Sequence, residues 1–212
     1  MNSIIKEKRY ISERIGVPYE SLSQSYLRSE FDLTNKNVSV IDFLLQRNKV
    51  QAPNVTERLL DLNDEFVITN FNVSLVNYND ADTDLAKLTK TLQTYESPAT
   101  FGNGYEPLKS VYNGDLNFTI DRTEFIPAFP CSAFRRVPLT QINAENGGTA
   151  PVQNAYDNGL YGFYPSEPTV INGRQTIDLS IDLGTSLNFA ALQGASATVV
   201  FEARGYLVVN AK

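Results

Sequence analysis

Three aspartates at alternate positions are the first feature of the chain that could do chemistry. The run Asp80-x-Asp82-x-Asp84 resembles the start of a calcium-binding loop, in which oxygens from alternate residues bind the ion. Such a loop needs Gly at its sixth position and a bidentate Glu at its twelfth, but here these are Leu85 and Thr91. We therefore predict that the acids precede a helix over residues 85–95, where they stabilise its N-terminal dipole, and we expect no metal site.

Cys131 is the only cysteine, and the chain contains neither histidine nor tryptophan. A Ser-His-Asp or Cys-His arrangement therefore cannot form, and a zinc site with a histidine ligand is excluded. The commonest general base near neutral pH is also missing. We expect Cys131 to be a buried structural thiol, and we expect the chain to have no catalytic residue and no cofactor.

Adjacent Arg135 and Arg136 could bind phosphate or carboxylate groups. Neighbouring residues of a strand face opposite sides, so only one of them can serve a given surface, and an ion pair between subunits is an equally good interpretation. Phosphate loops require Lys-Ser/Thr after their glycines. Neither Gly102-Asn103-Gly104 nor Gly147-Gly148 is followed by that pair, so we predict no phosphate loop.

Four aromatic residues gather in one turn-rich segment. They could form a platform on which a sugar stacks, but aromatics also anchor long loops to a body or to a neighbouring molecule, which is the interpretation we prefer. The 24 carboxylates always leave room for an acid pair of the glycosidase kind, although no local motif marks one. The four residues are Tyr156, Tyr161, Phe163 and Tyr164.

Composition and charge describe an ordinary globular chain with an acidic body. Of its 212 residues, 42% are hydrophobic and 20% are charged, with a net charge of −6. Residues 1–60 hold nine Lys/Arg against seven Asp/Glu, whereas residues 61–212 hold nine against seventeen. Broad binding of nucleic acid needs clustered cations, so such contact is at most weak and confined to the N-terminal segment. No signal peptide or membrane-spanning apolar run is recognisable, and we expect synthesis in the cytoplasm.

The first sixty residues have helical patterns that favour an N-terminal arm. Apolar residues at helical spacing over 4–15 end at Gly16, which is typical of a helix terminus. Pro18 can begin a second helix that reaches residue 27. Ser39 with Asp42 resembles a capping box and predicts a third helix that reaches residue 45. Helices this short are unstable alone, so we expect the arm, residues 1–60, to lie on another surface.

From about residue 64 the apolar period changes from helical to alternating, which is typical of strands. Two Asn-Gly pairs, Asn113-Gly114 and Asn172-Gly173, predict two-residue hairpin turns. Apolar parity slips near Thr69-Asn70, which predicts a bulge. Long turn-rich connections are expected over residues 97–107, 143–154 and 157–168. The strands expected cover residues 66–75, 116–120, 177–183 and 197–209, with weaker candidates at 124–129 and 134–142.

The fold class that follows is mainly β, an antiparallel β-sandwich or jelly roll with a helical N-terminal arm. Seven or eight short strands over about 150 residues are typical of these folds. No helix is expected between the late strands, which disfavours a parallel α/β sheet. The body is expected to span residues 61–212.

In this organisation the chain resembles the jelly-roll proteins of virus and bacteriophage particles. The resemblance rests on the arm from Ile4 to Leu60 and on the strands around Asn113-Gly114 and Asn172-Gly173. It implies a non-enzymatic virion structural protein, a self-assembling capsid shell subunit or a shell-associated minor protein, whose partners are copies of itself and other virion proteins and not a membrane. The main alternative is a fibre or spike module that binds a carbohydrate or a receptor through its loop aromatics.

Overall fold

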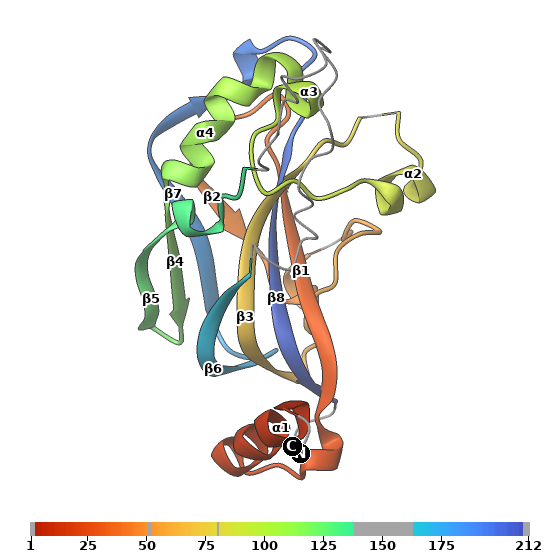
Figure 1. Ribbon diagram of the computed structural model, residues 1–212, viewed down its shortest axis with the longest axis vertical. Coiled ribbons are helices and arrows are strands. Elements are labelled where there is room, and N and C mark those ends of the chain that lie inside the picture. Colours follow the sequence, from red (N-terminus) through yellow and green to blue (C-terminus); the bar gives the residue numbers. More distant parts are fainter. Residues whose placement is uncertain (1–2, 51, 80, 138–162, 210–212) are drawn as a thin grey trace, which may run out of the picture.

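Two antiparallel sheets of four strands each form a β-sandwich-like body in the computed structural model, which describes residues 3–50, 52–79, 81–137 and 163–209. The two sheets lie face to face (Figure 1). We call the first of them sheet A and give its strands in their spatial order. Sheet A runs β1 (Ser23–Asp32), β8 (Thr198–Val208), β3 (Glu65–Val76), β6 (Tyr164–Asn172).

Sheet B is the second sheet, and helices α3 and α4 lie at the end of the body opposite α1 (Figure 1). In the part of the chain that the structure describes, α4 packs against β7 of this sheet and α2 protrudes to the right in Figure 1. Sheet B runs β2 (Asn37–Phe43), β7 (Ile177–Asn188), β4 (Asp115–Ile120), β5 (Thr123–Pro130). The helices are α1 (Ser3–Ile15), α2 (Asp84–Thr89), α3 (Pro98–Phe101), α4 (Tyr105–Asn113) and the short 3-10 turns η1 (Tyr19–Ser21), η2 (Arg47–Lys49), η3 (Gly102–Gly104), η4 (Cys131–Phe134) and η6 (Phe189–Ala191).

The strands pair in a nested order. β1 pairs with β8, β2 with β7, β3 with β6 and β4 with β5, all antiparallel. The chain therefore doubles back once, between β4 and β5, and each earlier strand meets a correspondingly later one. Two further ladders, β3 with β8 and β4 with β7, join these pairs into the two sheets.

Aromatic side chains fill much of the space between the sheets. Phe71 and Phe201 of sheet A stack with ring centroids 6.4 Å apart, and Phe201 lies 5.8 Å from Phe43 of sheet B. Each buried ring removes a large apolar area from water and contributes on the order of 1.5–3 kcal/mol. The core is thus the main stabilising element, and it holds residues from both halves of the chain.

Sheet A also buries part of its outer face, under α1. Ile11 of α1 is fully buried against Val67, Tyr206 and Val208, together with Leu22. Strands β3 and β8 are therefore apolar on both faces here, which explains why the second face of residues 197–209 looked partly apolar in the sequence. Only α1 is a true helix among the three predicted in the N-terminal segment.

The predicted helices over residues 18–27 and 39–45 are wrong. Residues 23–32 form β1, and residues 37–43 form β2. In both segments burial alternates, as at Ile41 and Phe43, so that a period of two competes with the local capping signals. Pairing with β8 and β7 supplies backbone hydrogen bonds that a short isolated helix cannot match. The segment 23–43 thus contributes one strand to each sheet.

Neither Asn-Gly pair forms the predicted hairpin. Asn113 ends helix α4, and Gly114 leads into β4 where an added Cβ would meet the Asp182 carbonyl. Asn172-Gly173 does lie in a tight turn, closed by a bond from Gln175 N to Asn172 O of 3.1 Å. That turn joins β6 of sheet A to β7 of sheet B, so the chain changes sheet there and the two strands do not pair.

Several strand predictions are confirmed, and others need correction. The register of β3 shifts between Ile68 and Asn70, as the slip in parity predicted. Residues 124–129 fall within β5, and 177–183 within β7. Residues 134–137 are not a strand, and 138–142 lie outside the described residues. Helix α2 is shorter than predicted. The helices α3 and α4, which lie within and just after the loop expected at 97–107, were not predicted. Strand β6 occupies part of the loop expected at 157–168.

Candidate functional site

The alternating aspartates are used within their own loop. The Asp82 carboxylate accepts a hydrogen bond from Asn79 N at 2.8 Å and lies 3.1 Å from Lys90 Nζ. These two contacts lower the pKa of Asp82. Asp84 is the first residue of α2, whereas Asp80 lies outside the described residues. Across the described chain, no three His, Cys, Asp or Glu side chains cluster closely enough to hold a metal ion.

Cys131 is buried, as predicted. It is fully excluded from solvent at the start of η4, and burial raises its thiol pKa to about 12. The thiolate is the nucleophilic form of cysteine, so a pKa this high leaves almost none at neutral pH. Burial and the raised pKa therefore make the thiol a poor nucleophile in the folded protein.

Arg135 forms a two-pronged ion pair with Glu96. Its Nε and Nη2 atoms donate to Glu96 Oε2 and Oε1 at 3.0 and 2.6 Å, and the Glu96 side chain is only 3% exposed. Burial raises the pKa of Glu96, but the hydrogen bonds and charge of Arg135 outweigh it and the net shift is downward. The Arg136 backbone N–H instead donates to the Thr94 carbonyl, and the Thr94 hydroxyl donates to the Arg136 carbonyl. The two arginines thus tie residues 94–96 to the chain after η4, and Arg135 is committed to a partner within its own chain.

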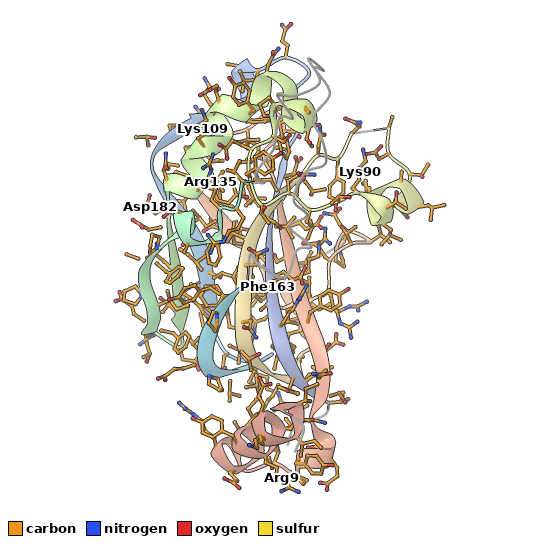
Figure 2. The ribbon with its side chains drawn as sticks, in the orientation of Figure 1. Arg9, Lys90, Lys109, Arg135, Phe163 and Asp182 are labelled. Atoms are coloured by element: carbon orange, nitrogen blue, oxygen red, sulfur yellow. The ribbon has the colours of Figure 1, made fainter. Side chains whose placement is uncertain are left out.

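The aromatic segment is used in part by the body. Arg204 lies 3.8 Å from the centre of the Phe163 ring, on sheet A (Figure 2). Tyr164 packs against Phe129, with ring centroids 4.7 Å apart, and against Phe71. Tyr156, Tyr161 and the Gly147-Gly148 pair lie outside the described residues. The two aromatics that are described therefore anchor the chain to the sheets.

A cluster of charged residues on sheet A was missed in the sequence. Arg28 Nη2 lies 2.7 Å from Glu30 Oε1 and also donates to the Tyr78 hydroxyl at 2.9 Å. Glu57, from the segment before β3, accepts a hydrogen bond from the Glu30 backbone N–H. Burial raises the pKa of Glu57, and the nearby charge of Glu30 adds to that effect. Three elements that are far apart in sequence meet here, and no local motif marks them.

This charged cluster covers a free sheet edge. Arg28 and Arg58 exchange two backbone hydrogen bonds of 2.8 and 2.9 Å, and Glu57 binds one more N–H of β1. An open edge strand offers unpaired backbone groups to other chains. The best-supported role of the charged cluster is therefore to protect the edge strand β1 from pairing with other chains.

Three exposed apolar surfaces lie elsewhere on the body. On α2, the side chains of Leu85 and Leu88 are 72% and 57% exposed. The edge strand β2 exposes Val40, with Leu44 just after it. Exposed patches of this kind mark sites of interaction. The third surface lies on α1 and its flank, and consists of Ile4, Ile5, Tyr10 and Tyr19.

The outer face of sheet B is uniformly acidic. Its four strands contain five Asp or Glu residues and no Lys or Arg. Asp115 and Asp182 stand directly opposite each other in the ladder between β4 and β7. Like charges in that position repel each other and destabilise a sheet. The sequence showed this alternation at Asp178 and Asp182, but the pairing of the strands was needed to bring the acids together.

No protein-family model matches the chain, and neither a curated protein nor a solved structure is similar to it. Among the described helices, none has the length and apolar character needed to cross a membrane. The function must therefore be argued from the topology and surfaces of this chain alone.

Proposed function

We propose that this protein is a non-enzymatic structural protein of a virus or bacteriophage particle, with jelly-roll topology. It acts there as a self-assembling shell subunit or as a minor protein attached to the shell. The observation that carries the proposal is the nested pairing of the strands, from β1 with β8 to β4 with β5. A long hairpin wound around itself produces this order, and jelly rolls of this kind build capsid and lectin domains.

The surfaces support assembly more directly than the fold, because one fold can serve many functions. Leu85 and Leu88 project from a helix that stands apart from the two sheets (Figure 1). Apolar side chains in such a position stabilise a protein only when something covers them. A neighbouring subunit in a shell would supply that cover.

The groups that could do chemistry have structural partners. Asp82 is held by Lys90, Glu96 by Arg135, and Cys131 is buried with a raised pKa. A catalytic acid or base needs access to a substrate and a pKa near the working pH. These three groups serve the fold instead, which supports a structural role.

A carbohydrate- or receptor-binding module is the second candidate, because lectins share the jelly roll. Its strongest feature was the aromatic segment. Phe163 and Tyr164 pack on Arg204 and Phe129 within the body, where they anchor the chain to the sheets, although Tyr164 stays 44% exposed. Assembly is therefore the better-supported function.

Light scattering and electron microscopy of the purified full-length chain test the proposal. We expect a mass several times that of the monomer and closed or sheet-like particles, which grow with protein concentration. A monomer at every concentration would overturn the proposal. Glycan binding by such a monomer, lost in the Tyr161→Ala variant, would establish the second candidate instead.

A further inference from the structure

We propose that α1 of one copy docks onto the acidic outer face of sheet B of a second copy. The inference rests on the proposed self-assembly and names the two surfaces that meet. We call them the α1 surface (Ile5, Lys6, Arg9 and Tyr10) and the sheet B face (Val40, Asp42, Asp115 and Asp182).

The sheet B face places like charges opposite each other. Asp115 of β4 lies opposite Asp182 of β7. On the other side of β7, Asp42 of β2 lies opposite Ser180. Figure 2 shows Asp182 on the side of sheet B that faces away from sheet A. Asp182 uses one carboxylate oxygen to accept the Gly184 N–H, but the strands of this sheet provide no cation. A cationic surface from outside would remove this repulsion.

The α1 helix offers such a cationic surface. It contains four Lys or Arg residues against two Glu. Burial, together with the nearby charge of Glu7, raises the pKa of the Tyr206 hydroxyl of sheet A, so Glu7 lies near that sheet, whereas Lys6 and Arg9 are exposed. Figure 2 shows Arg9 pointing away from the body at its lower end. At 100° per residue, Lys6 and Arg9 lie on the side of the helix opposite Ile11, which is the residue that holds α1 on sheet A.

Apolar residues and dimensions match as well. Ile5 and Tyr10 flank the two cations, and Tyr10 is 52% exposed. On the sheet B face, Val40 is 39% exposed and is paired directly with Asp182. A helix of 13 residues is about 20 Å long, which is about the length of a strand of six residues such as β4. Both surfaces are therefore mixed apolar and charged, of opposite sign and of similar length.

The two surfaces are different, so the contact is heterologous. α1 lies at one end of sheet A, and the sheet B face lies on the flank of the body (Figure 1). Each copy can then bind one neighbour through α1 and another through sheet B. Repetition of such a contact produces rings or extended lattices, which is the behaviour that a shell subunit requires.

Charge reversal on the two sides tests the contact. The first variant is Lys6→Glu with Arg9→Glu, and the second is Asp42→Lys with Asp115→Lys. We expect each variant alone to associate about 100-fold more weakly than the unchanged chain, because like charges then face each other. Lys at 115 faces Asp182 in a favourable cross-strand pair, so the second variant keeps its melting temperature. An equimolar mixture of the two variants should assemble again, because each acidic α1 finds a basic sheet B face and each basic α1 an acidic one.

Sedimentation velocity of the full-length chains, alone and mixed, gives the result. Recovery of assembly in the mixture, with both variants folded by circular dichroism, supports the contact. This inference is overturned if both variants still assemble as the unchanged chain does, or if the mixture fails to recover assembly. Either result leaves the proposed function standing. An unchanged chain that never assembles overturns both.

Discussion

Removal of the Arg135 guanidinium should destabilise the fold through Glu96. Loss of one partner from a fully buried ion pair costs about 3–5 kcal/mol. The Arg135 side chain is 39% exposed, so water can solvate the carboxylate partly, and for Arg135→Ala we expect a loss of about 2–3 kcal/mol. In a chain of this size that corresponds to a fall in Tm of about 5–10 °C. Urea unfolding at neutral pH, followed by circular dichroism, measures the loss.

The pH dependence separates this mechanism from simple loss of packing. In the native chain the pKa of Glu96 lies below its ordinary value of 4.5. The stabilisation is therefore complete above that value and is lost as the pH falls through the lower folded-state pKa. In Arg135→Ala the main contact that opposes burial is lost, so the pKa of Glu96 rises and protonation relieves the variant. The difference between the two proteins should shrink as the pH falls to about 4.

Two further variants complete the test. Arg136→Ala changes an exposed neighbour and should stay within about 0.5 kcal/mol of the native chain. Adding Glu96→Gln to Arg135→Ala removes the buried charge and should restore part of the stability. The reasoning is refuted if the loss is the same at both pH values, or if the double variant is no more stable than Arg135→Ala.

Three other outcomes are expected. Deletion of residues 1–60 should leave an unfolded chain by circular dichroism, because it removes β1 and β2 from the two sheets; deletion of residues 1–17 should leave it folded but less stable, and a folded 61–212 fragment would contradict the topology. Gly205→Ala should abolish soluble expression, because the added Cβ would overlap the Val67 carbonyl oxygen; normal yield and Tm would refute this. Cys131 should react with a thiol reagent only after unfolding, because burial raises its pKa to about 12; rapid labelling of the native chain would count against it.

Strands could be predicted where apolar and polar residues alternate locally, because that alternation shows that one face is buried. In β7, Leu179 and Ile181 are buried and alternate with polar residues, and only an extended backbone gives this alternation. The bulge in β3 was equally readable, because a slip of one residue reverses the parity. β1 and β2 were misread because their capping-like residues resemble helix starts, while the β8 and β7 strands that pair with them lie far along the chain.

The candidate sites could not be predicted in the same way. The sequence indicated that Cys131 would be buried, since that depends on residue type and apolar neighbours. The partners Glu96 for Arg135, and Tyr78 for Arg28, come from distant segments. Their meeting depends on the path of the whole chain, which local spacing does not encode. The opposition of Asp115 and Asp182 likewise required the register of two strands.

The position of β8 has a consequence for how the protein folds during synthesis. Ser23 pairs with Leu207, so the first strand made by the ribosome waits for the last. β8 also stands inside sheet A, between β1 and β3, so until it has emerged β1 has no partner strand and β3 can pair only with β6. Contacts this distant in sequence form slowly, and unpaired strands are prone to aggregate meanwhile. The local hairpin of β4 and β5 can form earlier, but sheet B also needs β7 between β2 and β4, so both sheets of the nascent chain should close only when the last two strands have been made.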